Sequence, residues 1–577
     1  MKERPFVAIT YETTEGNRTG SWRFLTPRYQ DKTSPCSAGC PAGEDVGLIE
    51  MLVRQGLYEE AWEKILWENP MPGVCGRVCF HPCEGACSRT NFDSPVAIHT
   101  IERFLADKAL KGDFRKALAR PSARPQKIAV VGSGPAGLSA AWFLSMLGYS
   151  CDIFEASLEA GGILRWGIPE YRLPLSVLRS EIARIVGSGV RLFTGKDVSS
   201  ESFARAKKNY SAVFLGCGHS RGTRLGISGE NRKSVRDGLD FLRRVREGGK
   251  PRCQGLSVII GGGNTAVDVA RTIMRLGGKA VVLYRRRRED MPAFADEISM
   301  AIEEGVELKE LVTPAAIKSS GSRIRLTLAK MKIEGLGEDG RGRIVRDGNK
   351  TISKVVDHVF AATGAEAAET WYSPHLLNEG VLSFSHCIFS LEDRSIPVIY
   401  GGDLTNKTKN VAEAIASGKQ AAMALDTFFE RGIEEIAPRL AECRIGDGPA
   451  MSMEVYLRGP RSLRSSHIVR YEEINADYFD LQSRVGERRL PPEKRSSAFE
   501  EVDLGAAAEA ALREAARCFN CGICDQCDNC YVFCPDRAVI RANDVEGRHI
   551  NYDYCKGCGI CATECPRNAV NMREDRI

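Results

Sequence analysis

The sequence predicts an α/β protein built around two Rossmann-like nucleotide-binding folds and followed by a small iron-sulfur domain. Two observations predict the folds: apolar strands at 127–131 and 256–260 each run into a glycine-rich turn and then into an apolar-periodic helix. A third observation predicts the metal domain, because ten of the 21 cysteines lie within the last sixty residues. At 577 residues the chain is too long for one hydrophobic core, so several domains are expected.

The first glycine turn, G-S-G-P-A-G, has the G-x-G-x-x-G spacing of a dinucleotide site. Gly132 permits a tight turn, Gly134 lets the backbone approach a pyrophosphate, and Gly137 lets the helix pack on the strand. The next strand ends at Glu155, where a carboxylate would hold ribose hydroxyls. Free N–H groups at the helix N-terminus would bind the phosphates, so we expect a dinucleotide here.

The second glycine turn, G-G-G-N-T-A, places Gly261 and Gly263 in the first two glycine positions and Ala266 in the third, which is a tolerated variant. Its second strand ends in four arginines rather than in an acid. An arginine at this point can pair with a 2′-phosphate, so Arg285 and Arg286 favour NADP(H) over NADH. NADH stays possible, because a run of arginines also suits an exposed loop.

The first predicted nucleotide fold has an acid after its second strand, whereas the second fold has arginines there. Two nucleotide folds that differ in this way predict a flavin reductase, in which one fold holds FAD and the other a diffusible nicotinamide. Gly161 and Gly162, which follow the first acid, support the flavin fold. Later in the chain, Asp403 follows a strand and would bind the FAD ribityl chain, and a helix beginning at Val411 would face the flavin carbonyls. The A-A-T-G-A segment at 361–365 is expected to lead the chain from the nicotinamide domain back into the flavin domain.

Two copies of C-x2-C-x2-C-x3-C-P near the end of the chain are typical of a ferredoxin that holds two [4Fe-4S] clusters. In such repeats the cysteine beside the proline serves the other cluster. Zinc would favour paired C-x2-C motifs with a spacer, often with histidines, and disulfides would suit a secreted chain. We expect one cluster at Cys524, Cys527, Cys530 and Cys565, and a second at Cys555, Cys558, Cys561 and Cys534.

Composition sets the class of protein. Hydrophobic residues make up 43% and charged residues 27%, as in ordinary globular proteins, and a net charge of +5 does not suggest nucleic-acid binding. The N-terminus lacks the apolar stretch of a signal peptide, and no segment is long and apolar enough to span a membrane. We therefore expect a cytoplasmic protein, whose thiols stay reduced and favour metal over disulfide.

Five segments together resemble the glutamate synthase small-subunit family: G-S-G-P-A-G-L, A-G-G-I-L-R-W-G-I-P, G-G-G-N-T-A-V-D, Y-R-R-R and G-G-D. The resemblance extends to the flavin-bearing halves of dihydropyrimidine dehydrogenase and of bifurcating ferredoxin-NADP transhydrogenases. It covers residues 35 to 430, and it implies a nicotinamide domain inserted in an FAD domain. The expected domains are a helical iron-sulfur domain (1–120), an FAD domain in two parts (121–228 and 361–430), a nicotinamide domain (229–360), a linker and helix (431–507) and the two-cluster ferredoxin domain (508–577).

The same resemblance implies an iron-sulfur cluster in the N-terminal domain. Its ligands would be Cys40, Cys79 and Cys83, with Glu102 where relatives have a Gln or Glu. Relatives often carry an upstream C-x2-C pair that completes a second cluster, and this chain lacks it.

Several cysteines are left over. Cys36 and Cys87 either form a second, incomplete site or pack as small hydrophobes, and packing is the expected role of Cys75. A zinc site remains the alternative for the N-terminal domain. Cys518 and Cys521, in C-F-N-C-G, have no assigned cluster.

The C-terminal ferredoxin domain changes the expected function, because the glutamate synthase small subunit lacks such a domain. With it, the chain resembles the NAD(P)H oxidoreductase that accompanies dissimilatory sulfite reductase. We expect electrons to pass between NAD(P)H and a redox partner, sulfite reductase-like or another iron-sulfur enzyme, through FAD and [4Fe-4S] clusters; the direction is open. The alternatives are a glutamate synthase small subunit that serves an amidotransferase, and a wiring subunit with one empty nucleotide fold. The resemblance also makes a homodimer possible.

Overall fold

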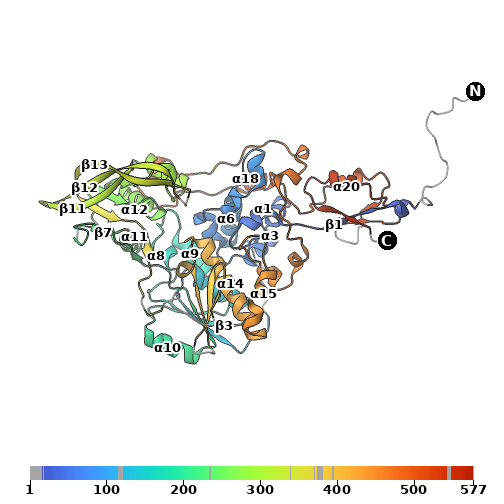
Figure 1. Cartoon of the computed structure of the whole chain (residues 1–577), viewed down its shortest axis with the longest axis horizontal. Helices are drawn as coiled ribbons and strands as arrows, with labels where there is room; N and C mark the ends of the chain where they lie inside the picture. The colour runs from blue at the N-terminus through green and yellow to red at the C-terminus, as the bar shows by residue number, and fades with distance from the viewer. Residues whose placement is uncertain are drawn as a thin grey trace, which may run out of the picture.

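The computed structural model describes residue 16 and residues 18–114, 118, 121–232, 235–337, 340–369, 371–372, 381–392, 396–541 and 547–575. The segment 1–15, on which the expectation of no signal peptide depends, lies outside this set. The molecule is elongated (Figure 1). The second nucleotide fold occupies one end, the ferredoxin-like domain occupies the other, and the helical N-terminal domain lies between them above the first nucleotide fold.

The first nucleotide fold is a seven-stranded sheet in the order β16-β17-β18-β5-β2-β3-β4. Its five strands from β18 to β4 are parallel, whereas β16 and β17 form an antiparallel edge. The long helix α14 packs against α7 on this sheet. The elements are β2 (Lys127–Val131), α7 (Pro135–Met146), β3 (Ser150–Phe154), α8 (Ile163–Trp166), α9 (Leu175–Gly187), β4 (Arg191–Phe193), α10 (Ser200–Asn209), β5 (Ala212–Leu215), β16 (Val381–Ser383), β17 (Cys387–Glu392), β18 (Ile396–Gly401) and α14 (Val411–Arg431).

The second nucleotide fold is a parallel five-stranded sheet in the order β10-β9-β8-β14-β7. An antiparallel sheet of β11, β12 and β13, which the sequence reading did not anticipate, shares a hydrophobic core with it. The elements are β7 (Val235–Asp237), α11 (Gly238–Arg246), β8 (Leu256–Ile260), α12 (Asn264–Arg275), β9 (Lys279–Leu283), α13 (Ala295–Glu303), β10 (Glu307–Lys309), β11 (Val312–Ser320), β12 (Arg323–Leu336), β13 (Gly342–Val356) and β14 (His358–Ala361).

The second nucleotide fold is inserted in the first. The chain leaves the first sheet after β5 through the short strand β6 (Arg221–Gly222) and returns through β15 (Ala365–Glu366). These two strands pair with each other, so both crossings share one narrow connection. The returning segment is the one that the sequence predicts at 361–365.

The N-terminal domain is a cluster of short helices between the two ends of the molecule (Figure 1). Helix α18 (Ala508–Ala516) comes from the far end of the chain and packs on α2 and α6 of this domain. The other helices are α1 (Pro35–Gly39), α2 (Val46–Arg54), α3 (Tyr58–Leu66), α4 (Pro72–Val78), α5 (Pro82–Gly85), η3 (Ser88–Asn91) and α6 (Ile98–Leu110).

The ferredoxin-like domain is completed by the N-terminal part of the chain. Strand β1 (Leu25–Tyr29) pairs antiparallel with β21 (Val570–Glu574) along its whole length. The domain also contains α19 (Asn529–Val532), the hairpin β19 (Val539–Arg541) and β20 (Arg548–Ile550), and α20 (Ile560–Thr563). The sequence reading did not foresee this pairing, because the two strands lie near opposite ends of the chain.

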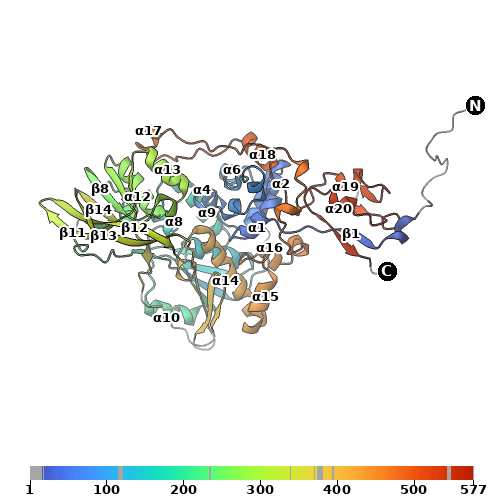
Figure 2. The same ribbon diagram turned by 45° about the horizontal axis from the view of Figure 1, so that its top comes forward.

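The segment predicted as a polar linker, residues 431–507, contacts the other domains. After α15 (Ile436–Glu442) and α16 (Met453–Tyr456), residues 484–503, here called the strap, run along the top of the molecule past α17 (Pro492–Arg495) (Figure 2). Arg484 pairs with Glu84 in the helical domain, and Arg495 pairs with Glu303 in the second nucleotide fold. Glu501 then returns to α4 and α6. Among the described residues, no helix is long and apolar enough to cross a membrane.

Candidate cofactor sites

The first glycine turn has the geometry that its sequence predicts. Gly132 has a φ of +94°, and a side chain there would meet the carbonyl of Gly216. A side chain at Gly137 would collide with the carbonyl oxygen of Gly132, so this glycine lets α7 approach β2. Open space surrounds the missing side chain of Gly134, which begins α7. The turn therefore leaves an uncovered helix N-terminus at the carboxyl edge of the sheet, where a pyrophosphate would bind.

Glu155 lies at the end of β3 and is held by the glycine turn itself. Both the backbone N–H and the hydroxyl of Ser133 donate to its carboxylate, at 3.0 and 2.6 Å, and the N–H of Ser157 donates from the other side at 2.8 Å. The Ser133 hydroxyl also accepts from the N–H of Gly161. Gly162, with a φ of +53°, comes against the Cα of Gly134. The structure thus brings the first acid and both later glycines to one turn, with Ser133 as a connection that sequence reasoning missed.

Asp403 and Val411 lie at the same edge of the sheet, just after β18. Burial raises the pKa of Asp403, although the nearby His219 and Lys409 lower it. Asn410 caps α14 by accepting from the N–H of Glu413 at 2.9 Å, so Val411 is the first helical residue, as expected. This cap follows the usual Asn-x-x-Glu pattern and could have been read from the sequence.

Asn406 marks this edge as a binding site. The residue is 5% exposed, yet neither its amide nitrogen nor its amide oxygen has a hydrogen-bond partner among the described residues. Leaving a buried amide unpaired is costly, so a polar ligand is expected beside it. The residues present therefore fit a flavin nucleotide, and Asn406 is a candidate contact that the sequence reading did not name.

The second glycine turn repeats the geometry of the first. Gly261 has a φ of +149°, and a side chain there would strike the carbonyl of Ala362. Gly263 begins α12 with open space beside it, and Ala266 is fully buried one turn later. The turn exposes the helix N-terminus in the same way and fits a second dinucleotide.

The four arginines after β9 have different surroundings. Arg286 is half-buried and donates from Nε to the carbonyl of Gly342 at 2.9 Å, and Arg287 pairs with two neighbouring acids. Arg288 donates to the hydroxyl of Ser299. Arg285 is exposed, and no described residue pairs with its guanidinium. Of the two arginines predicted to bind a 2′-phosphate, Arg285 is therefore the one that is available.

The eight ferredoxin cysteines converge in two sets. One cavity is lined by Cys524, Cys527, Cys530 and Cys565, and a second by Cys534, Cys555, Cys558 and Cys561. In each set the cysteine beside the proline comes from the other repeat, which is the grouping that the sequence predicts. The N–H groups of Ala538 and Ala569 donate to the sulfurs of Cys534 and Cys565, at 3.2 and 3.3 Å. Such N–H···S bonds stabilise cluster ligands and set their potentials.

Cys40, Cys79 and Cys83 form a third set in the helical domain. Burial raises the pKa of the Cys83 thiol, and the thiols of Cys40 and Cys79 raise it further because they lie close by. Glu102 is buried beside Cys40 and Cys79, whose thiol pKa values it raises. Its carboxyl accepts from the amide of Asn69 at 2.8 Å. The four predicted ligands of this cluster are therefore brought together.

The spacing of these sulfurs does not suit zinc. Tetrahedral zinc with Zn–S bonds of about 2.3 Å holds its sulfurs about 3.8 Å apart. Within the described part of the chain, the only three candidate ligand atoms that lie within 4.8 Å of one another belong to His81, Glu84 and His99. A cubane cluster holds its thiolates at four corners and so farther apart than a single ion does.

Comparisons with known proteins find family models that match the parts of the chain in which these sites lie. The pyridine nucleotide-disulphide oxidoreductase model matches residues 126–382, the model of dihydropyrimidine dehydrogenase domain II with its 4Fe-4S cluster matches residues 28–114, and the 4Fe-4S binding domain model matches residues 548–571. The glutamate synthase [NADPH] small chain of Escherichia coli is 32% identical over 423 residues, covering 68% of this chain and 88% of its own length. The chain belongs to the glutamate synthase small-chain family. It is an NAD(P)H-dependent iron-sulfur flavoprotein oxidoreductase, with an FAD- and NADP-binding fold and 4Fe-4S domains at both ends.

Two further relatives of this family match more of the chain. The beta subunit of NADP(+)-dependent formate dehydrogenase from Moorella thermoacetica is 32% identical over 528 residues, or 85% of this chain and 70% of the relative. The beta subunit of NADPH-Fe(3+) oxidoreductase from Geobacter sulfurreducens is 30% identical over 534 residues, or 86% of this chain and 76% of the relative. The expected family, fold class and cofactors are thereby confirmed.

In this member of the family, the flavin fold and the cluster domain are joined by a buried ion pair. The ammonium of Lys419 in α14 lies 2.6 Å from the carboxylate of Glu68, and both side chains are 1% exposed. Lys419 also donates to the carbonyl of Ala42, just after Cys40 in the chain. Since α14 begins at Val411, Lys419 lies about 12 Å along the helix from the flavin edge. One rigid helix therefore fixes the flavin site relative to the nearest cluster site.

Proposed function

We propose that this chain carries electrons between NADPH and a redox protein that docks at the ferredoxin end. FAD, when bound, converts a two-electron hydride into single electrons, which [4Fe-4S] clusters can accept one at a time. The residues proposed to hold FAD share one edge of the first sheet: Gly132, Gly134, Gly137, Glu155, Gly161, Gly162, Asp403 and the helix N-terminus at Val411. Gly261, Gly263, Ala266 and Arg285 would hold NADPH.

The observation that carries this proposal is the order of the domains. The nicotinamide fold and the ferredoxin domain lie at opposite ends of the molecule, with the flavin fold and the helical cluster domain between them (Figure 1). A protein that reacted only with small molecules at the flavin would not need a separate cluster domain so far from it. The arrangement favours entry at one end and exit at the other, and it serves either direction of flow.

The surface around the ferredoxin clusters supports docking of a protein. Cys527 and Cys558 are the two exposed cysteines, one from each set. Between Cys530 and Cys534 in the sequence, on and just after α19, Val532 is 67% exposed and Phe533 is 47% exposed. Large apolar side chains left open beside a redox centre suit a protein partner that covers them.

The relatives suggest the class of partner. Those that match 85% and 86% of this chain are named as beta subunits of a formate dehydrogenase and of an Fe(3+) oxidoreductase, whereas the glutamate synthase small chain matches 68%. We therefore favour an iron-sulfur enzyme, sulfite reductase-like or another, over an amidotransferase. A homodimer is part of the proposal through the family alone. All 21 cysteines are free, which suits the reducing cytoplasm that we propose as the location.

An anaerobic titration tests this function. Purified protein is mixed with increasing NADPH, and in a parallel sample with NADH, while flavin and cluster absorbance are recorded. We expect NADPH to bleach both, and at lower concentration than NADH. Absence of bleaching by either nucleotide, or bleaching of the flavin alone, would contradict electron transfer to the clusters.

A further inference from the structure

Cys518 and Cys521 lie at the junction between the helical domain and the ferredoxin domain. They follow α18 directly, and their loop is held by the N-terminal part of the chain. The side chain of Asn520 donates to the carbonyl of Gly47 at 2.8 Å, and the carbonyl of Gly522 accepts from the N–H of Lys32 at 2.8 Å. The loop is therefore fixed beside α1 and α2.

This loop has the backbone conformation of the two ferredoxin loops. In each ferredoxin loop, the residue before the second cysteine and the residue after it have positive φ angles. The angles are +60° and +71° at Gln526 and Asp528, +73° and +82° at Gly557 and Gly559, and +50° and +78° at Asn520 and Gly522. Asparagine and glutamine adopt this region at a cost, so the repetition indicates a conformation that a ligand requires.

The sulfurs in this loop also receive the same hydrogen bond. The N–H of Asn520 donates to the sulfur of Cys518, two positions back, at 3.4 Å. Cys524 and Cys555 receive the corresponding bond from the residue two positions later, and so does Cys87. Cys79 of the helical-domain set receives the same bond from the N–H of His81 at 3.3 Å, so Cys518 and Cys87 share this feature with predicted cluster ligands in both domains.

Four thiols meet at this junction. Cys36 and Cys518 belong to one hydrophobic core, and Cys87 packs against it. The guanidinium of Arg89, two residues after Cys87, donates to the carbonyl of Arg517, just before Cys518, at 2.5 Å. The Cys521 sulfur lies 3.6 Å from the hydroxyl of Ser88, the residue after Cys87. The Cys36 sulfur lies 3.4 Å from the hydroxyl of Ser34.

We propose that Cys36, Cys87, Cys518 and Cys521 hold a further [4Fe-4S] cluster. The C-x2-C pair that relatives often carry before the position of Cys36 is absent here, and the pair at the other end of the chain takes its place. The cluster would take up or release one electron, with no change in its ligands.

A buried carboxyl group provides independent support. Glu50 in α2 is 1% exposed, and neither of its oxygens has a hydrogen-bond partner among the described residues. Helix α2 packs against α18, which ends two residues before Cys518. A carboxyl group buried without a partner is expensive, and a cluster sulfur in this space would accept its proton as a hydrogen bond.

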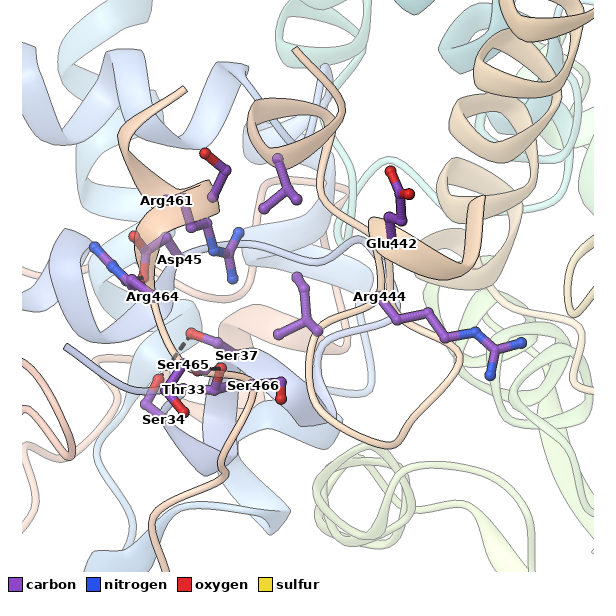
Figure 3. A pocket seen from close by; sticks show the side chains of 13 residues that line it. Thr33, Ser34, Ser37, Asp45, Glu442, Arg444, Arg461, Arg464, Ser465 and Ser466 are labelled. Carbon is purple, nitrogen blue, oxygen red and sulfur yellow. Dashed lines mark hydrogen bonds and ion pairs between the residues drawn. The ribbon is translucent and has the colours of Figure 1, made fainter. Parts of the chain in front are cut away.

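The other side of Cys36 is polar. Ser34, just before α1, and Ser37, within it, flank Cys36 and line a cavity of about 110 Å³ with Arg461 and Arg464 (Figure 3). The two serine hydroxyls are 2.8 Å apart, so Ser34 is positioned to donate to a thiolate at Cys36. A hydroxyl donor stabilises negative charge on a cluster ligand.

This cluster would connect the other sites. Cys36 is one helical turn from Cys40 of the helical-domain set, a rise of about 6 Å. Cys521 is separated by only three positions from Cys524 of the ferredoxin set, so their Cα atoms are at most about 11 Å apart. The proposed cluster therefore lies between the cluster site near the flavin and the ferredoxin domain, and it completes a continuous row of clusters.

Metal analysis of the anaerobically purified full-length protein tests the proposal. We expect about sixteen irons and sixteen acid-labile sulfides per chain for four clusters. The variant C518S/C521S should lose about four irons relative to the wild type and keep its FAD. C36S, which removes a ligand contributed by the N-terminal domain, should lose the same four irons. As a matched control, Cys253→Ser, which changes a fully buried cysteine in the core of the second nucleotide fold, should keep the full count.

Two results would overturn the proposal. The first is a wild-type count of about twelve irons that stays unchanged in C518S/C521S. The second is loss of FAD and all clusters together in every variant, with native mass spectrometry of the wild type finding only three clusters. Because the count needs no nucleotide, it is independent of the proposed function. Failure of NADPH to bleach the clusters would contradict that function and leave the cluster count standing.

Discussion

Arg285 provides the sharpest test of nucleotide specificity. It is exposed and no described residue pairs with its guanidinium, whereas its three neighbours are engaged. If it binds the 2′-phosphate of NADPH, Arg285→Ala removes a charge-assisted hydrogen bond worth about 1.5–3 kcal/mol. Because the side chain is open to solvent, we expect the lower part of this range, which corresponds to roughly tenfold in affinity.

The assay is steady-state reduction of an artificial acceptor such as ferricyanide. We expect kcat/KM for NADPH to fall about tenfold in R285A, mostly through KM, and kcat/KM for NADH to stay within about twofold. Arg288→Ala, which changes an arginine of the same run bound to Ser299, is the matched control and should leave both values unchanged. Equal losses with NADPH and NADH, or equal effects of R285A and R288A, would refute the assignment.

Three further predictions concern the contacts that join the domains. Lys419→Met leaves the carboxylate of Glu68 buried without its ammonium and should lower the unfolding free energy by about 3–5 kcal/mol, seen as a lower melting temperature. Burial lowers the pKa of His99, but hydrogen bonds with Glu487 and Glu84 raise it to about 9. The stability that protonated His99 contributes is therefore fully present below pH 6.5, and about 3 kcal/mol of it should be lost as the pH rises through about 9. In thermal unfolding, His99→Gln should flatten this pH dependence. Glu501→Gln weakens the attachment of the strap and should speed its cleavage in limited proteolysis.

Each of these variants has an internal comparison. K419M/E68Q removes both charges and should recover part of the loss, since the isolated buried carboxylate is the main cost. An equally steep pH dependence in wild type and H99Q would show that His99 does not cause it. Glu500→Gln, next to Glu501, should leave proteolysis unchanged, and equal cleavage of both variants would contradict the role of Glu501.

The glycine turns and the ferredoxin repeats could be read from the sequence because their chemistry fixes local spacing. Gly132, Gly137 and Gly261 occupy positions where any side chain would strike a backbone carbonyl. The two four-cysteine sets require short loops, so the positions of their ligands along the chain predict which cysteines meet. The strand–turn–helix units followed for the same local reason.

Long-range assembly could not be read in this way. The pairing of β1 with β21 joins opposite ends of the chain, and the short sequence of neither strand identifies its pairing partner. Cys518 and Cys521 had no assignment because Cys36 and Cys87 lie near the opposite end of the chain. The strap reads as a polar linker, yet Arg495 is nearly buried because it pairs with Glu303 of another domain.

Some missed features did carry a local signal. The segment I-R-L-T-L-A-K-M-K-I, now in β12, alternates apolar and polar residues as a strand should. Asn406 carried none, since an asparagine after a strand is usually only a turn residue. Its unpaired amide became informative once its burial was known.

We expect electrons from NADPH to reach the ferredoxin end through the flavin and a row of clusters. Rapid freeze-quench electron paramagnetic resonance, after anaerobic mixing with NADPH, tests it most directly. The flavin should be reduced first, and reduced-cluster signals should follow, including those lost when Cys527 and Cys558 are replaced by serine. Reduction of the flavin with no cluster signal in the wild type, over the time of many turnovers, would contradict it.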